Sequence, residues 1–444
     1  MFSINIEEYK CVLGAPNSAS LVAILASSVF QKNIDSALFI VEAIFKDENY
    51  KFEHPTNREI LTYARGQAKR GMWNAVVFSD ENRENAWLLI QSTSFVDFII
   101  TESNLFYVGK NKSSYIDIQL SKLISTINER ALWNGDIKKI AFEIGQTTPY
   151  HFFYDQLKYL RYICSSKKVF ANGNSIFFSP EAVGVELSQE KPLNVVSFFP
   201  SIVTQNSCNA LGYGGGDMSQ KVRKPTKLQN NDVVAARVRE IMEDMETSLL
   251  NYALKGDISN TDSAIDNGAV SIWIGITSSK RSWLQQIEGY TNIVKALASD
   301  YHKVNVFVDG VTSAINVVSP KSKDTDVYKL LASNLVSCTN INLVSLIGTN
   351  YESKIKVCNS VDAFIANGGT GSFVPLRVLR KPGVIHTNTK LMTFPDEYAN
   401  VSVLIGEDDH STNDQDPAGT MSYRLDWREI LQALQSCLDK KGND

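Results

Sequence analysis

The sequence lacks the features that mark several common classes of protein. It has no run of about 18 apolar residues, so no membrane-spanning helix is predicted. Its start lacks a basic segment followed by an apolar run, so no signal peptide is predicted. The six cysteines are far apart and none forms a C-x-x-C pair, which argues against a zinc or dithiol site. We therefore expect a reduced, cytoplasmic protein.

The sequence also lacks an excess of charge of either sign. Lys and Arg number 44 against 48 Asp and Glu, and the net charge is -4, so nothing drives the chain toward nucleic acid. A small basic cluster nevertheless leaves open a peripheral contact with the inner face of a membrane; a solvated surface is the alternative. The cluster consists of Lys221, Arg223, Lys224 and Lys227. No G-x-S-x-G, H-E-x-x-H or P-loop lysine motif is present.

A polar break divides the chain. Residues 206–231 are rich in Gly and Asn and poor in periodic apolar positions, which is typical of a linker or mobile loop. The length of 444 residues also favours two domains. We place the first at 1–225 and the second at 226–444. In the first, expected strands lie at 9–14, 36–44, 73–79, 86–91, 95–101, 105–109 and 138–144, and expected helices at 18–30 and 116–133.

The second half alternates strands and helices regularly after a long amphipathic helix at 232–254. Strands are expected at 269–276, 304–308, 341–347, 361–366 and 383–386, with helices at 282–299, 326–336, 373–380 and 427–438. This spacing predicts a parallel, doubly wound sheet whose ligands bind at the carboxyl ends of the strands. The fold class is therefore α/β, with two Rossmann-like domains facing across a cleft and a strand-rich insert at 73–120 in the first.

A glycine-rich turn in the second half suits a phosphate group. The apolar strand near 361–366 leads into Gly368, Gly369, Thr370, Gly371 and Ser372, and a helix follows. Glycines let a backbone approach an anion closely, and a helix start adds N–H groups and a positive dipole. The alternative is a strand-to-helix turn whose glycines serve only tight packing.

A second turn of similar character opens the same half. The strand at 269–276 ends in Ser278, Ser279, Lys280 and Arg281 before a helix. Cations at the carboxyl end of a strand can pair with phosphate. A solvated basic pair is the alternative. Both turns are expected at the same edge of one sheet.

With these two turns, the C-terminal segment resembles the donor-binding domain of GT-B glycosyltransferases, closest to the heptosyltransferase-like group. That group opens the domain with a strand, a small-residue turn carrying a basic residue and a helix, as at 269–298. It closes with a strand, a Thr-Gly turn, a short helix and Gly-Lys-Pro, as at 365–385, where Arg380-Lys381-Pro382 stands at the Gly-Lys-Pro place. At the Asp and His places of the Thr-Gly motif this chain has Gly369 and Val374.

The resemblance implies sugar transfer from a nucleotide-sugar donor to a hydroxyl of a glycan, lipid-linked or protein acceptor, with no metal and no cofactor. It implies donor phosphates at Lys280 or Arg281, Thr370, Gly371 and Ser372, and the nucleobase near Gly348. Two alternatives stay open: a non-catalytic nucleotide-binding scaffold protein of a glycan assembly complex, and an epimerase acting on nucleotide-sugars.

A candidate general base lies in the first half. A strand ends at Gly145, and a helix beginning near Pro149 carries His151 and Asp155 four residues apart on one face. Either group could take the proton of an acceptor hydroxyl while the other orients it. A pair that only caps the helix locally is the alternative. Asp217, in the polar break, is another candidate base.

Two acidic segments have the residue types of a cation site. Asp324-Thr325-Asp326 spells D-x-D, but it precedes a helix, so N-capping explains it better than a metal. Residues 407–410, Glu-Asp-Asp-His, lie in a polar stretch that predicts a solvated loop.

Overall fold

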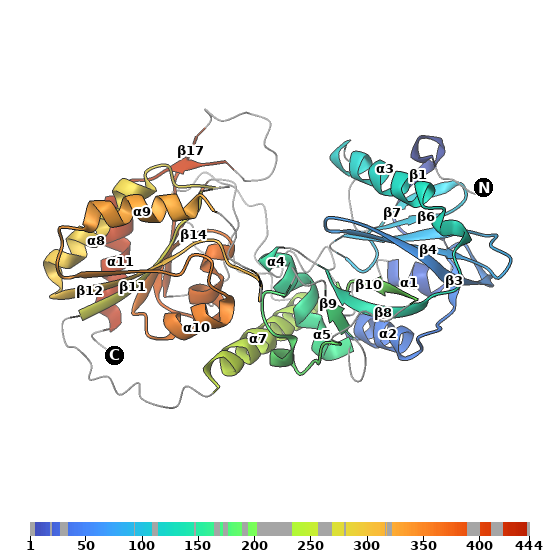
Figure 1. Ribbon diagram of the computed structural model, residues 1–444, viewed down its shortest axis with the longest axis horizontal. Helices are drawn as coiled ribbons and strands as arrows, with labels where there is room; N and C mark the ends of the chain where they lie inside the picture. Colours follow the sequence, from blue (N-terminus) through green and yellow to red (C-terminus); the bar gives the residue numbers. More distant parts are fainter. Residues whose placement is uncertain are drawn as a thin grey trace. The chain divides into compact units, whose positions relative to one another are not determined.

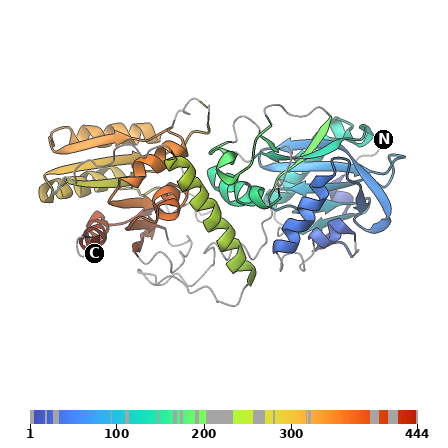
Figure 2. The same cartoon turned by 90° about the horizontal axis from the view of Figure 1, so that it is seen from below.

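The chain folds into two compact units. The computed structural model describes residues 5–17, 20–26, 34–92, 94–108, 114–145, 148–163, 169–171, 176–188, 194–201, 233–255, 269–278, 281–315, 317, 322–388, 400–409 and 421–441. The first unit holds the described residues up to 201 together with 233–245, and the second holds those from 246 onward. The expected helix after the polar break is α7 (Val233–Leu254), one uninterrupted helix that contributes residues to both units (Figure 2, yellow-green). The predicted boundary at 225 lies outside the described residues.

The main sheet of the first unit has seven strands, labelled in part in Figure 1, in the order β1-β7-β6-β5-β4-β3-β2. They are β1 (Lys10–Leu13), β2 (Phe52–His54), β3 (Asn57–Arg70), β4 (Trp73–Ser79), β5 (Trp87–Gln91), β6 (Phe98–Ile100) and β7 (Asn104–Tyr107). All neighbours are antiparallel except β1 and β7. The expectation of a Rossmann-like sheet is therefore wrong here. The connections from β3 to β7 are too short for crossover helices, so the supposed insert is the body of the sheet.

Short helices cover this sheet. Helix α3 (Ser114–Glu129) presents Leu120, Leu123, Ile124 and Ile127 to the same core as Trp73, Leu88 and Phe98. The other helical elements are η1 (Ile6–Glu8), α1 (Leu21–Ala26), α2 (Ile34–Lys46) and η3 (Leu132–Asn134). The strand expected at 36–44 is wrong, because these residues form α2.

A small parallel sheet completes the first unit, in the order β10-β8-β9. Its strands are β10 (Val195–Phe198), β8 (Lys139–Ile144) and β9 (Val169–Ala171). Between β8 and β9 run α4 (Pro149–His151), the π-helix η4 (Phe152–Leu157) and α5 (Lys158–Ile163), and η5 (Pro180–Val183) follows β9. This confirms the strand expected at 138–144 and the helix expected to begin near Pro149.

The second unit has a six-stranded, fully parallel sheet in the order β13-β12-β11-β14-β15-β16. Its strands are β11 (Ala269–Gly275), β12 (Lys303–Asp309), β13 (Ile341–Ser345), β14 (Ala363–Asn367), β15 (Gly383–Thr387) and β16 (Val401–Ile405). This is the strand order of a doubly wound dinucleotide-type fold, which confirms the expected sheet in this half. Helix α10 and strand β16 are additional to the elements expected.

Helices cover both faces of this sheet. One face packs α8 (Gln286–Asp300), α9 (Asp324–Leu335) and α11 (Trp427–Lys441), with Tyr290, Leu331 and Leu434 in a core with Ile272 and Val306. After β14, the short η6 (Thr370–Ser372) leads into the π-helix η7 (Phe373–Val378). This π-helix packs against α10 (Tyr351–Asn359). The remaining elements are the short strands β17 (Glu407–Asp408) and β18 (Tyr423–Arg424). Across the described ranges, no helix has the length and apolarity needed to cross a bilayer.

A buried histidine lies at the end of β15. The ring of His386 is 1% exposed and contacts the Tyr290 hydroxyl through Nε2 at 3.0 Å and the Tyr423 hydroxyl through Nδ1 at 2.6 Å. Because the Tyr290 hydroxyl donates to the Gly275 carbonyl, Nε2 is assigned as the donor of a neutral ring. Nδ1 is then an acceptor, and it shares the proton of the Tyr423 hydroxyl with the His386 carbonyl, which lies 3.1 Å from that hydroxyl. Burial lowers the pKa of His386 to about 3.

This histidine should make the second unit less stable in mild acid. Below the unfolded pKa of about 6.5, the unfolded ring takes a proton that the native ring refuses, so the free energy of unfolding falls as pH drops toward 3. Between pH 7 and pH 5 the loss is about 2 kcal/mol from this group. Urea unfolding of the wild type and His386→Gln at both pH values checks it. Between pH 7 and pH 5 the free energy of unfolding of His386→Gln should fall less than that of the wild type. An equal fall in both proteins would contradict a histidine that stays neutral when buried.

Candidate functional site

The two turns singled out in the sequence lie next to each other in the second unit. Strand β11 pairs with β12 on one side and with β14 on the other, so the strand order reverses between β11 and β14. At such a switch point the loops after the two strands diverge and leave a crevice at the carboxyl edge of the sheet. Residues 276–278 and 281 follow β11 in the chain, and residues 368–372 follow β14.

An arginine joins the two turns. A Cβ atom built on Gly369 would lie 3.3 Å from Nη2 of Arg281, so the guanidinium lies against the backbone of the glycine-rich turn. Gly369 has φ +154°, a conformation that other residues rarely adopt. Arg281 itself has φ +54°, which is uncommon outside glycine and costs free energy that the surrounding structure must offset. The positively charged Arg281 side chain therefore lies against a turn whose backbone conformation at Gly369 favours glycine.

Two of the hydroxyl groups predicted at the donor site, those of Ser278 and Ser372, are engaged within the protein. Ser372 donates from Oγ to the Gly369 carbonyl at 2.7 Å, and Ser278 donates from Oγ to the Asp324 carboxylate. Each hydroxyl has one proton, so in this state neither donates to a ligand. Arg281 and the backbone of the glycine-rich turn are therefore the better candidates for holding an anion. Gly368 donates its N–H to the His386 carbonyl at 2.8 Å and so fixes the start of that turn.

The other residues predicted to bind the nucleotide-sugar lie farther from these two turns or outside the described residues. Gly348 follows β13, which β12 and β11 separate from β14, and its N–H donates to the Val311 carbonyl at 2.7 Å. Ser279 and Lys280 lie outside the described residues, and so does the side chain of Thr370, whose backbone begins η6.

The D-x-D segment has a role other than the one expected. Asp324 is 7% exposed, and its side chain accepts from the Val311 N–H at 2.8 Å and from Ser278, whereas the N-cap position of α9 falls on Lys323 without a side-chain bond. The N-capping expectation is therefore wrong for Asp324, because its carboxylate turns toward the loops after β11 and β12 instead. Among the residues described, no group of three or more His, Cys, Asp or Glu side chains is arranged to hold a metal.

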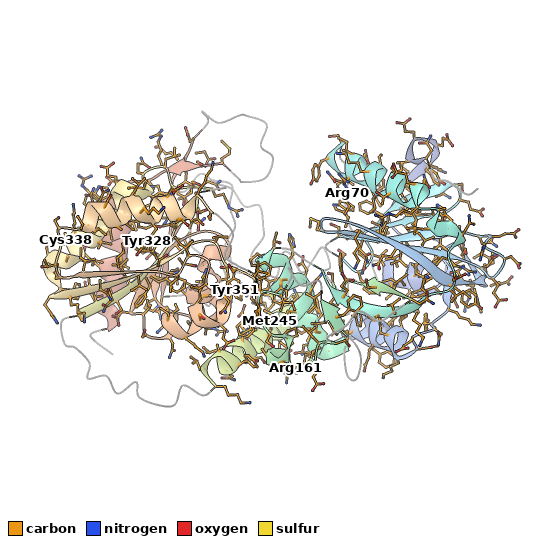
Figure 3. All side chains as sticks on the ribbon, viewed as in Figure 1. Arg70, Arg161, Met245, Tyr328, Cys338 and Tyr351 are labelled. Atoms are coloured by element: carbon orange, nitrogen blue, oxygen red, sulfur yellow. The ribbon has the colours of Figure 1, made fainter. Side chains whose placement is uncertain are left out.

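A buried ion pair, missed in the sequence, fixes the loop after β12. Nζ of Lys354, on α10, lies 2.5 Å from Asp309 Oδ1 and donates to Thr312 Oγ1 at 2.6 Å and to the Gly310 carbonyl at 3.2 Å. The side chains of Lys354 and Asp309 are 0% and 7% exposed. Tyr351, labelled in Figure 3 at the start of α10, lies beside them with its ring centroid 5.8 Å from Nζ. The strand-end dipeptide Asp309-Gly310 was visible in the sequence, but its partner 45 positions along the chain was not.

The candidate base in the first unit is a histidine–carboxylate pair. Asp155 is buried within the π-helix η4, and its Oδ2 contacts Nδ1 of His151 one turn earlier; the His151 side chain is 29% exposed. A carboxylate at Nδ1 favours the tautomer with the proton on that atom, so the Nε2 lone pair is the acceptor. π-Helical turns often occur at functional sites. Asp217 lies outside the described residues.

The turn that carries this pair is tied to the end of β8. Oε1 of Gln156 accepts the Gly145 N–H at 3.1 Å, and a Cβ on Gly145 would lie 2.3 Å from Phe199 Cε1. Glycine is therefore required where the chain leaves β8. These contacts position α4, and with it His151, at the carboxyl edge of the small parallel sheet.

A scan against protein-family models found no match, and a search of curated proteins found none. The solved structures similar to this chain include three at 10% sequence identity. The glycosyl transferase family 9 protein of Veillonella parvula has a TM-score of 0.29 over 76% of this chain and 82% of that chain. The E. coli heptosyltransferase WaaC with ADP has a TM-score of 0.30 over 61% and 73%. A TarM variant of S. aureus with UDP has a TM-score of 0.23 over 90% and 74%.

Proposed function

We propose that the chain is a glycosyltransferase that holds a nucleotide-sugar donor by its phosphates at the switch point of the second unit. The observation that carries the proposal is the guanidinium of Arg281 lying against Gly369 where β11 and β14 meet. A doubly wound sheet binds ligands at that position, and a positive lining there favours an anion.

The lining would also assist the reaction. Arg281, with Lys280 next to it in sequence, would stabilise the negative charge that develops on the departing diphosphate. Such stabilisation by fixed cations replaces what a metal ion supplies in other transferases. The chemistry proposed for this site therefore requires no ion.

The acceptor step would use the pair in the first unit. His151 would take the proton of an acceptor hydroxyl on Nε2 while Asp155 holds the ring and stabilises the imidazolium. The hydroxyl oxygen would bond to the anomeric carbon, and the bond from that carbon to the phosphate oxygen would break, leaving its electron pair on the diphosphate. A glycan, lipid-linked or protein hydroxyl would satisfy this chemistry. If nucleotide binds and no donor turns over with any acceptor, the non-catalytic scaffold alternative is favoured.

A thermal-shift panel with UDP, GDP, CMP and ADP tests the donor site. One nucleotide should raise the melting temperature of the wild type, and Arg281→Gln and Lys280→Ala should each weaken its affinity by about tenfold or more, since a charge-assisted bond is lost. Lys303→Gln removes a cation at the opposite, amino end of β12 and should leave the shift unchanged. The donor site would be ruled out if no nucleotide shifts the wild type, or if Arg281→Gln responds like the wild type.

A further inference from the structure

A separate cavity lies in the first unit, at the other end of β8 from the segment that carries His151. It has a volume of about 380 Å³ and lies among the bulge of β3, the turn after α3, Lys138 just before β8 and the first residues of β10. Its polar lining consists of Arg65, Gln67, Arg130, Asn134 and Lys138. A cavity of this size accommodates a sugar-sized molecule.

The charge of the lining is of one sign. Three cations line the cavity and no carboxylate is among the described residues that do so. Lys138 contacts an amide, the Asn194 Oδ1 atom, at 2.5 Å rather than an acid. The nearby carboxylate of Asp136 lies 3.9 Å from Arg83 instead.

The buried arginine of the lining is held in place. Arg65 is 4% exposed, and it donates from Nε to Ser79 Oγ at 3.0 Å and from Nη2 to the Glu81 carbonyl at 3.3 Å. These partners are neutral, and the carboxylates of Asp80 and Asp136 offset its charge only from farther away. Burial, followed by repulsion from Arg83, lowers the pKa of Arg65, and attraction from Asp80 and Asp136 opposes this shift only in part.

The backbone around the cavity is also unusual. Ala131, which lines it, has φ +48°, and Asn194, which holds Lys138, has φ +60°. Left-handed conformations of residues other than glycine cost about 1 kcal/mol and tend to occur at ligand sites. A Cβ on Gly135 would lie 2.3 Å from the Arg65 carbonyl oxygen, so the turn after α3 approaches β3 closely only because glycine is there.

We propose that this cavity binds an oxyanion, a phosphate or carboxylate group carried by a sugar-sized molecule or glycan substituent. Arginine forks and lysine bind both groups, and the amide of Asn134 adds a neutral hydrogen bond. The Gln67 amide is bonded to Asn74 and Ser197 and contributes only to the shape of the cavity wall. The site is independent of the donor site, since it lies wholly in the first unit and needs neither Arg281 nor a nucleotide.

Calorimetric titration of the full chain with orthophosphate and, separately, with glucuronate tests this site. Arg130→Gln with Lys138→Gln should weaken binding of the anion by about tenfold or more, because two charge-assisted contacts are lost. Lys10→Gln with Lys122→Gln removes the same charge from exposed positions of the first unit and should leave binding unchanged. Arg281→Gln should also leave it unchanged.

The two anions identify the group: binding of phosphate alone points to a phosphate ester, and binding of glucuronate points to an acidic sugar. The proposal is overturned if neither anion binds the wild type. It is also overturned if the Arg130 and Lys138 variant binds as tightly as its charge-matched control, or if only Arg281→Gln loses the anion. Matching melting temperatures of the variants exclude unfolding as the cause.

Discussion

His151→Ala is expected to lower kcat for sugar transfer about 100- to 10,000-fold, the range that a general base contributes. The readout is nucleotide release from the donor that the thermal-shift panel identifies, with acceptor present. Nucleotide affinity should be unchanged, because the donor site belongs to the other unit. A lower kcat with unchanged nucleotide affinity would show that the variant has lost its base, because a misfolded chain would also lose nucleotide affinity.

The carboxylate partner gives a second readout. Asp155→Asn keeps the size of the side chain but removes the charge that favours the imidazolium and the required tautomer. It should therefore lower kcat while leaving the KM for the acceptor unchanged, whereas a purely structural role would alter both. If His151→Ala retains more than a tenth of the wild-type kcat while Asp217→Asn loses activity, the base is Asp217 and our assignment is wrong.

Lys354→Met is expected to destabilise the second unit by about 3–5 kcal/mol, the cost of leaving a buried charge without its partner. Only the Gly310 N–H, at 2.8 Å, would then contact Oδ1 of Asp309 among the bonds described. Burial raises the pKa of Asp309, while Lys354 lowers it. Removing the lysine should raise that pKa further, so the penalty should be largest at high pH and shrink as the pH falls and the carboxyl takes a proton.

A double variant sharpens this test. Asp309→Asn combined with Lys354→Met removes both charges, and it should be more stable than Lys354→Met alone at pH 8. Urea unfolding at pH 8 and pH 5 measures both effects. A loss below about 1 kcal/mol for the single variant, or additive losses in the double variant, would show that the pair contributes little.

The second half was predictable because its pattern is repetitive. Each buried strand is short, apolar and followed by a polar turn and an amphipathic helix, as at 269–276 and 282–299. Parallel strands connected in this way place their carboxyl ends at one edge, so the proximity of Arg281 to Gly369 follows from the pattern. The position of the Asp324 side chain does not follow from the pattern, because its hydrogen bonds to Ser278 and Val311 depend on how two loops fold.

The first half was less predictable because the apolar pattern along its sequence does not match which residues are buried in the fold. Helix α2 buries Ile34, Ala37, Leu38, Val41 and Ile44 at helical spacing, but Phe39 on its outer face is 68% exposed. That exposed aromatic residue completes a nearly continuous apolar run and makes the segment resemble a buried strand. Strand β3 was missed for the opposite reason: its first residues are exposed and polar, so no apolar alternation marks where it begins. The short connections among β4 to β7 were the available signal for an antiparallel sheet.

The most direct test of the donor site is a crystal structure of the chain soaked with the nucleotide that gives the thermal shift. We predict a phosphate within hydrogen-bonding distance of the Arg281 guanidinium and the backbone of 369–371, at the carboxyl ends of β11 and β14. A nucleotide bound elsewhere on the sheet, or on the first unit, would contradict it.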